Sequence, residues 1–408
     1  MYSSPLRWAK YSKGGKQNMK KKLLSMVLST AMVASLLVGC GSSSDSTTAT
    51  ADTTTETATE EAAPADDAAE ATDEAAATDN VGAGTRVGVS MPTKDLQRWN
   101  QDGANMQAEL EAAGYEVDLQ YASNDVQTQV SQIENMISSG ANVLVIAAIE
   151  GSSLGEALDM AKSANIPVIA YDRLLMNSDA VSYYATFDNY MVGTKQGQYI
   201  VDTLDLDNVD GPFNLEITAG DPGDNNAGYF YNGAMDVLNP YIEAGKLVVV
   251  SGQSSFDECA TPVWATETAQ SRAENILSSN YADGTQVDVW LCSNDSTALG
   301  VENALEANYT GEWPIITGQD CDVANVKNML AGKQSMSIFK DTRTLASQVV
   351  KMVGQILQGE TVDVNDTESY DNGTGIIPSF LCEPVYADKD NYKELLIDSG
   401  YYTEADLQ

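Results

Sequence analysis

The sequence predicts an α/β protein of two doubly wound lobes, joined by a hinge that the chain crosses more than once. Three observations support this fold class. Short apolar runs alternate with helical periodicity in two successive series. The chain has 408 residues, 43% of them hydrophobic, which is enough for two cores. After Asp320 come a further helix, strand and helix, which are expected to return to complete the first lobe, so that the hinge is crossed more than once.

The first series runs from residue 86 to residue 171. The pattern predicts strands at 86–91, 115–121, 143–149 and 167–171, and helices at 99–113, 126–137 and 154–164. The run VLVIAAI at 143–149 is apolar throughout, which is typical of a strand buried on both faces of a parallel sheet.

The second series has the same rhythm. It predicts strands at 213–218, 247–251, 287–292 and 315–318, and helices at 190–204, 227–238, 262–279 and 297–308. A helix at 323–331, a strand at 336–339 and a helix at 345–358 follow. We therefore expect an N-terminal lobe over 81–187, completed by about 321–357, and a C-terminal lobe over 188–320, completed by about 358–408.

The first 40 residues predict an export signal. They hold seven basic and no acidic side chains, and Lys20–Lys22 lead into an uncharged, mostly apolar run at 23–38. This run is shorter than the roughly 20 residues of a membrane-spanning helix. Its ending, LVGC, resembles the bacterial lipobox, which implies lipidation of Cys40; cleavage elsewhere is the alternative. Met19 precedes the basic run directly, so residues 1–18 resemble an over-extended start.

Residues 41–80 predict a disordered acidic tether. Ala, Thr, Asp and Glu fill 33 of these 40 positions, and no aromatic residue, Leu, Ile or Val occurs. An Ala–Glu helix is the alternative, which the Thr clusters disfavour. The folded part that follows carries a net charge of -33 out of -37 for the whole chain.

Composition excludes several classes of function. The acidic charge argues against nucleic-acid binding, which needs a basic face. The absence of histidine removes Ser-His, Cys-His and His-ligated zinc chemistry. Cys259, Cys292, Cys321 and Cys382 could pair in three ways or remain buried thiols, but no C-x-x-C spacing indicates a metal or redox site. We expect no cofactor and no metal.

Polar side chains follow most of the predicted strands, where ligands bind in open parallel sheets. They are Lys94, Arg98, Asp172, Arg173, Asp221, Asp224, Asn225, Asn226, Asn294, Asp295, Gln319, Asp320 and Lys340. Carboxylate, amide and guanidinium groups pair well with vicinal hydroxyls. Helix caps and turns explain part of the Asp and Asn content, but not the cations Arg98, Arg173 and Lys340.

At these positions the chain resembles type I periplasmic sugar-binding proteins, in the group of the multiple sugar-binding receptor and the xylose-binding protein. The motifs are MPTK (91–94), RW (98–99), SQIENM (131–136), AYDR (170–173), YYATFDN (183–189), DNNA (224–227), SND (293–295), GQD (318–320) and FKDT (339–342). The resemblance implies two Rossmann-like lobes that close on one monosaccharide and deliver it to an ABC permease.

Carried over by motif, the implied sugar contacts are Arg98, Asp172, Arg173, Asn226 or Asn225, Asn294, Asp320 and Lys340. Trp264 resembles the aromatic residue that covers a face of the sugar ring, and packing at a helix start is the alternative. We expect Trp99 in the core and leave Lys94 open between cleft and solvent. Cys292 and Cys321 flank the SND and GQD motifs and make the sugar specificity harder to transfer.

The resulting hypothesis is an extracytoplasmic, lipid-anchored or periplasmic solute-binding protein for an aldopentose, aldohexose or related sugar, monomeric and not an enzyme. One alternative is a sugar sensor that contacts a chemoreceptor or a two-component membrane sensor. A second is a glycoside hydrolase using Asp172 and Asp320, which needs one carboxyl held protonated. A third, a sugar-responsive repressor, requires a DNA-binding segment where the signal and tether stand.

Overall fold

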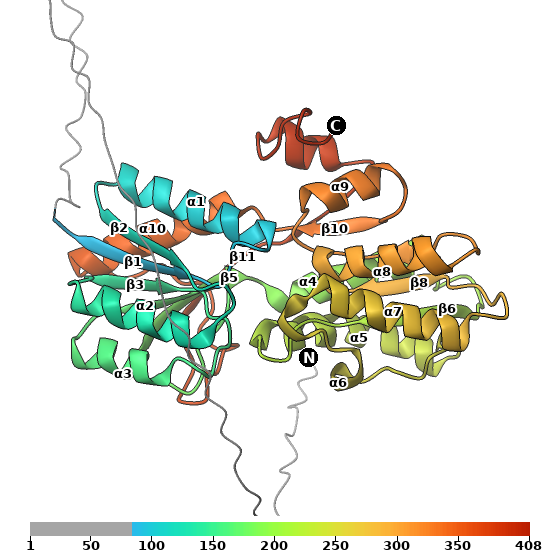
Figure 1. The fold of residues 1–408 in the computed structure, drawn as a ribbon, viewed down its shortest axis with the longest axis horizontal. Coiled ribbons are helices and arrows are strands. Elements are labelled where there is room, and N and C mark those ends of the chain that lie inside the picture. Colours follow the sequence, from blue (N-terminus) through green and yellow to red (C-terminus); the bar gives the residue numbers. More distant parts are fainter. Residues whose placement is uncertain (1–83) are drawn as a thin grey trace, which may run out of the picture. The chain divides into compact units, whose positions relative to one another are not determined.

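The computed structural model describes residues 84–408 (Figure 1). The predicted signal with Cys40 and the predicted tether over 41–80 lie outside the described residues. Within 84–408, no helix is long and apolar enough to cross a membrane.

The first lobe is built on a six-stranded parallel sheet in the order β11-β5-β4-β3-β1-β2. Its strands are β1 (Arg86–Met91), β2 (Glu116–Tyr121), β3 (Val143–Ile146), β4 (Val168–Tyr171), β5 (Val181–Phe187) and β11 (Ser379–Cys382). Helices α1 (Gln97–Ala112) and α10 (Thr342–Gln358) lie on one face, and α2 (Val126–Ser138) and α3 (Gly155–Ser163) on the other (Figure 1).

The alternation of side chains along β3 explains why both faces need a helical layer. Val143 and Val145 pack in the core that includes α1 and α10, whereas Leu144 and Ile146 pack in the core that includes α2 and α3. All four side chains are fully buried, as expected for an apolar run in a doubly covered sheet.

The second lobe repeats this design on a four-stranded parallel sheet in the order β7-β6-β8-β9. Its strands are β6 (Phe213–Thr218), β7 (Leu247–Val249), β8 (Val289–Cys292) and β9 (Ile315–Ile316), and its helices are α4 (Asn189–Thr203), α5 (Asn225–Glu243), α6 (Phe256–Cys259), α7 (Thr266–Asn280) and α8 (Asp295–Asn308). Along β8, Val289 and Leu291 face the core with α4 and α5, and Trp290 faces the core with α7 and α8.

The C-terminal part of the chain is divided between the two lobes at other residues than those expected. Helix α9 (Val323–Leu330) leads to β10 (Met336–Phe339), which bridges to Gln319 beside β9 and pairs with β12 (Val385–Asp388). Residues 321–340 therefore belong with the second lobe, and the expectation that they complete the first is wrong.

A second boundary is also corrected. Strand β11 pairs in parallel with β5, so Ser379–Cys382 completes the first sheet rather than the second lobe. Helix α10 packs in the first lobe, and the turn Lys393–Asp398 belongs to the second. The expected series also lacked the strands β5, β11 and β12. The pattern of apolar residues shows that a segment is buried, but the partner strand is chosen by tertiary packing.

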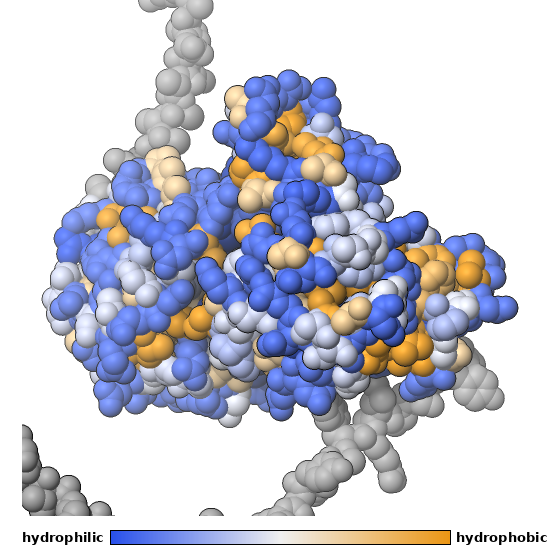
Figure 2. Space-filling model, turned by 45° about the vertical axis from the view of Figure 1, so that its right-hand side comes forward, coloured by the Kyte–Doolittle hydropathy of each residue, from blue (hydrophilic) through white to orange (hydrophobic). Residues whose placement is uncertain are grey.

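The chain thus crosses between the lobes after β5, after β10 and after β11. Hydrophilic residues cover most of the face in Figure 2, with hydrophobic residues in separate groups. The expected fold class, two doubly wound α/β lobes, is confirmed.

Candidate functional site

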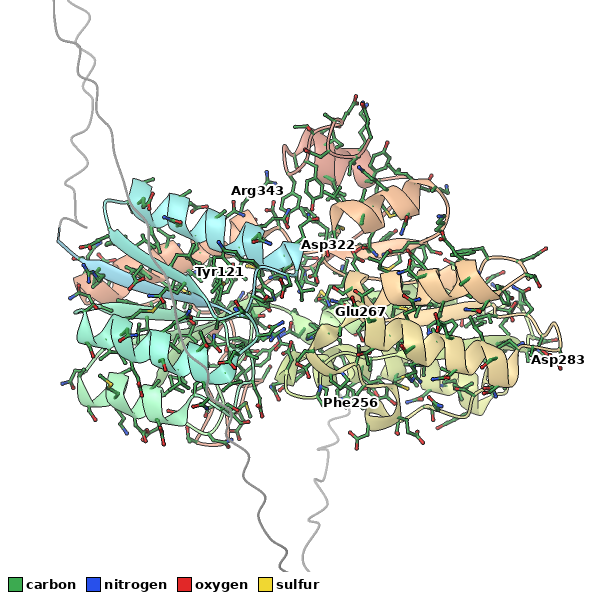
Figure 3. The ribbon with its side chains drawn as sticks, in the orientation of Figure 1. Tyr121, Phe256, Glu267, Asp283, Asp322 and Arg343 are labelled. Carbon is green, nitrogen blue, oxygen red and sulfur yellow. The ribbon has the colours of Figure 1, made fainter. Side chains whose placement is uncertain are left out.

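One polar cavity lies where the carboxyl ends of strands from both sheets meet. The space between atoms in it and at its mouth, open solvent included, is about 430 Å³. It is lined by Leu96, Arg98, Trp99, Asp172, Arg173, Asp224, Asn226, Phe230, Trp264, Asn294, Ser296, Gln319, Asp320, Asp322 and Lys340. Asp322, labelled in Figure 3, stands at the start of α9.

Arg98, in the first turn of α1, forms the centre of an ionic cluster. Its Nε, Nη2 and Nη1 donate to Asp102 at 2.5 Å, Asp172 at 2.6 Å and Asp320 at 3.0 Å. Asp172 follows β4 in the first lobe, and Asp320 follows β9 in the second, so one guanidinium links the two lobes. Only 6% of the Arg98 side chain is exposed, and such buried charge-assisted bonds are strong and directional.

Arg173 makes the second ionic link between the lobes. Its Nε lies 2.9 Å from Oδ2 of Asp224, the residue that caps α5, and its Nη1 donates to the main-chain oxygens of Ala148 and Ile149 at 3.0 Å. Asp224 uses Oδ1 to accept from the main-chain nitrogen of Asn226, which leaves Oδ2 for Arg173. One carboxylate therefore both caps α5 and pairs with Arg173.

Trp264 is the aromatic wall of the cavity. Its Nε1 donates to Oδ2 of Asp224 at 3.2 Å, and its ring centroid lies 6.3 Å from that of Phe230. Val263 and Trp264 both have positive φ, an uncommon conformation for bulky residues that turns the indole back toward the sheet. Gly220 makes room for it, because a Cβ there would lie 2.0 Å from the indole Cη2.

Lys340 closes the site from the hinge. It follows β10 directly, and its Nζ lies 3.0 Å from Oδ1 of Asp320, the atom that also accepts from Arg98. The ammonium lies 6.0 Å from the ring centroid of Phe187 and 5.7 Å from that of Phe230. Two cations thus share one carboxylate oxygen beside two apolar rings.

Burial and neighbouring cations shift the pKa values of the carboxyl groups in and beside the site in different directions. Burial raises the pKa of Asp102 to about 6, because Arg98 only partly opposes it. Burial also acts on Asp172, but Arg98, Lys340 and Arg173 outweigh it and lower the pKa of that carboxyl. Burial raises the pKa of Asp224 against the influence of Arg173.

An ionised Asp172 is unsuited to act as the general acid of a glycoside hydrolase, which must carry a proton. Asp320 is engaged with two cations, Arg98 and Lys340. The geometry therefore favours binding over the hydrolytic alternative.

The structure brings eight of the ten ligand-binding candidates together at the cavity. They are Arg98, Asp172, Arg173, Asn226, Trp264, Asn294, Asp320 and Lys340. Asn294 caps α8 through Oδ1, which accepts from Thr297, so its Nδ2 is the group left for a ligand.

Lys94 and Asn225 are not among the lining residues. Lys94 is exposed, and its Nζ lies 4.7 Å from the ring centroid of Tyr121, labelled in Figure 3. Asn225 is half-buried, while its neighbour Asn226 donates to the main-chain oxygen of Asp172 at 2.6 Å. Of the two asparagines that the DNNA motif offers as sugar contacts, Asn226 is therefore the one that lines the cavity.

Sequence reasoning missed other lining residues, notably Trp99 and Phe230, and it named Gln319 only as a polar residue at a strand end. Trp99 was expected in the core; it is 4% exposed and packs there, yet its ring also borders the cavity, 5.0 Å from the Arg173 guanidinium carbon. The position of Trp99 directly after Arg98 in the sequence was the signal that could have placed its ring at the cavity. Phe230 lies one helical turn after Asn226, on the same face of α5.

The four described cysteines are free and buried, so the alternative of free thiols holds within residues 84–408. Burial raises the pKa of Cys259 and of Cys382 to about 11, which leaves these thiols unreactive at neutral pH. In the same part of the chain, no group of three or more Cys, Asp or Glu side chains is arranged to hold a metal ion.

Two parallel-sheet lobes that enclose a polar cavity at their strand ends define a two-lobed solute-binding protein. The chain belongs to the periplasmic binding protein domain family, whose model matches residues 87–361. The expected family is thereby confirmed, and it is a family of binding proteins rather than enzymes.

Relatives and solved structures agree with this assignment. The chain is 49% identical over 326 residues (79% of this chain, 92% of the relative) to the multiple sugar-binding periplasmic receptor ChvE of Rhizobium radiobacter. It is 34% identical over 322 residues (79% and 92%) to the D-xylose-binding periplasmic protein of Escherichia coli. An ABC transporter solute-binding protein of Clostridium phytofermentans, solved with bound β-D-glucose, is 72% identical, with a TM-score of 0.79, over 79% of this chain and 100% of that one.

Proposed function

We propose that this protein captures a monosaccharide between its two lobes and delivers it to an ABC transporter. The observation that carries the proposal is the ionic cluster of Arg98, whose single guanidinium joins Asp172 of the first lobe to Asp320 of the second inside the cavity. The sugars named for its relatives, glucose and xylose among them, are aldoses with several adjacent hydroxyls.

The chemistry of the cavity matches such a ligand. Each sugar hydroxyl donates one hydrogen bond and accepts others, and the cavity offers both roles side by side. Asp172 and Asp320 accept, whereas Arg98, Arg173, Lys340 and the amides of Asn226 and Asn294 donate. Trp264 supplies a flat apolar surface for the C–H groups of a pyranose ring.

The ion pairs also prepare the site in advance. Each carboxylate is already oriented by a cation, so little side-chain freedom remains to be lost when the sugar binds. A sugar that contacts Asp172 and Asp320 together favours the closed arrangement of the lobes, and a permease can distinguish that arrangement from an open one.

The proposed location is outside the cytoplasmic membrane. The basic and apolar run before Cys40 supports export, and the LVGC ending supports a lipid anchor on that cysteine. Metabolic labelling with an alkyne fatty acid tests this: wild type is expected to take up label, and Cys40→Ser is expected to take up none.

Titration calorimetry of the full chain tests the binding function. D-glucose, D-xylose and D-galactose are titrated in turn, with tryptophan fluorescence followed in parallel because Trp264 borders the cavity. We expect at least one of these aldoses to bind at about micromolar affinity or tighter. Absence of saturable binding by every sugar in the panel would contradict the proposal.

A further inference from the structure

One buried side-chain amide lies in the cavity beside the ionic cluster and takes part in no ion pair. Gln319 follows β9 and lines the cavity next to Asp320, and only 1% of it is exposed. Its main chain is held by a bridge to Ile338 of β10 and by its carbonyl, which accepts from the main-chain nitrogen of Asp295 at 2.9 Å.

The orientation of the amide is set by one contact. Nε2 of Gln319 donates to the main-chain oxygen of Ser293 at 3.0 Å. A carbonyl can only accept, so the nitrogen of the amide must point at Ser293 and Oε1 must point elsewhere. Oε1 is buried, and within residues 84–408 no group donates a hydrogen bond to it. A buried acceptor without a donor is costly, which makes such an atom a place for a ligand donor.

We propose that Oε1 of Gln319 accepts a hydrogen bond from one hydroxyl of the bound monosaccharide and makes Gln319 a specificity-determining residue. This inference rests on the proposed sugar-binding function. The carboxylates of Asp172, Asp224 and Asp320 in the cavity are already paired with cations, and those cations can serve ligand acceptors as well. Gln319 instead requires a donor at one position, so a sugar that lacks this hydroxyl loses affinity.

Gln196 provides a matched control. It is also a buried glutamine, 1% exposed, and its Nε2 donates to the main-chain oxygens of Ser293 and Gly318 at 3.2 and 2.9 Å. It therefore supports the same strand ends as Gln319, but it does not line the cavity. Gln196→Met removes a structural amide without removing a cavity acceptor.

The experiment measures coupling between the amide and each ligand hydroxyl. D-glucose and its monodeoxy analogues are titrated into the full chain as wild type, Gln319→Met, Gln319→Glu and Gln196→Met. In wild type we expect one deoxy analogue to bind at least about tenfold more weakly than glucose because of this bond. In Gln319→Met, the affinity for that analogue is expected to lie within about threefold of the affinity for glucose. Gln319→Glu keeps an acceptor oxygen and is expected to retain the wild-type difference in affinity. Gln196→Met is expected to retain it as well.

The outcomes separate the inference from the function on which it rests. If wild type binds no monosaccharide, the proposed function fails. If wild type binds and Gln319→Met keeps the full deoxy profile, the function stands and the role of Gln319 is overturned. If Gln319→Met lacks a cooperative thermal transition, Gln319→Ala is measured in the same way, and an unchanged deoxy profile in that variant overturns the role equally.

Discussion

Two sets of contacts join the lobes, and they differ in chemistry. The cavity set comprises the two ionic contacts there, Arg98 with Asp320 and Arg173 with Asp224. Outside it, Tyr402 of the second lobe accepts from Gln97 and Gln101 of α1 at 2.8 and 3.0 Å and donates to the main-chain oxygen of Cys321 at 2.9 Å. The cavity set uses groups that can also bind a sugar, whereas the Tyr402 set uses groups that do not line the cavity.

This difference indicates how recognition and lobe geometry are divided. A change in the cavity set is expected to alter ligand affinity and stability together. A change in the Tyr402 set is expected to alter stability with little effect on affinity. The following predictions test that division, from the largest expected effect to the smallest.

Arg98→Ala is expected to have the largest effect. It leaves Asp102, Asp172 and Asp320 without their shared guanidinium, and breaking one partner of a buried pair typically costs about 3–5 kcal/mol. We expect this loss in the free energy of unfolding by urea denaturation, and no detectable sugar binding by calorimetry.

The control for Arg98 is Arg343→Ala. Arg343, labelled in Figure 3, pairs with Asp341 away from the cavity and is partly exposed. A loss of about 1 kcal/mol or less and wild-type sugar affinity are expected. Unchanged sugar affinity in Arg98→Ala would contradict the claim that the cavity set, unlike the Tyr402 set, determines affinity.

Glu302→Gln examines a buried carboxyl that no cation neutralises by direct pairing. Burial raises the pKa of Glu302 to about 7, with Asn328 and Lys333 opposing it. Because the folded state binds this proton more tightly than the unfolded chain, the group lowers the free energy of unfolding as pH rises from about 4.5 to about 7. We expect the variant to be about 1–3 kcal/mol more stable than wild type at pH 8 and similar at pH 4.

Asp172 supplies the opposite case for that measurement. Its lowered pKa means that its contribution to stability is present above the ordinary pKa of an aspartate and is lost as pH falls below it. Urea denaturation of wild type and Glu302→Gln between pH 3 and pH 8 separates the two trends. Parallel stability curves for both proteins over the whole range would contradict the assignment to Glu302.

Gly220→Ala tests the aromatic wall without changing a charge. The new Cβ would lie 2.0 Å from the indole of Trp264, so the ring must move out of its place. We expect sugar affinity to fall by about tenfold, through loss of ring stacking, as measured by calorimetry. Gly228→Ala, in α5 with open space around its Cβ position, is the control and should bind as wild type does. Equal affinity in both variants would remove Trp264 from the proposed site.

Tyr402→Phe is expected to have the smallest effect. Removal of the hydroxyl costs about 1 kcal/mol of unfolding free energy, because three hydrogen bonds outside the cavity are lost. Sugar affinity should stay within about threefold of wild type. Tyr190→Phe, which removes a surface hydroxyl bonded to Asp236, serves as the control. A larger loss of affinity than in Gly220→Ala would show that the Tyr402 set also governs recognition.

The order of helices and strands was largely predictable from the sequence, but their partners were not. Apolar runs such as 143–149 identify a strand because both faces of the sheet are covered. Whether β10 or β11 joins the first or the second sheet depends on packing between distant segments, which periodicity does not record.

The candidate site was predictable where strand ends and motifs coincide, as at Asp172 and Arg173. The site residues on helices were less predictable, because the side chains of neighbouring helical residues point about 100° apart. Asn226 therefore lines the cavity, whereas Asn225 does not. The sequence places Gln319 at a strand end, but only the direction of its amide in the structure distinguishes it from a structural glutamine such as Gln196.

The direction of β1 has a practical consequence for coupling this protein to a surface. The strand begins at Arg86, and its carboxyl end points toward the cavity, roughly 17 Å further along for six residues. A bead, electrode or dye attached ahead of Thr85 is therefore joined at the end of the sheet opposite the opening. Sugar should exchange freely with the immobilised protein, which recommends the N-terminal side as the attachment point for a reusable sugar-detection layer.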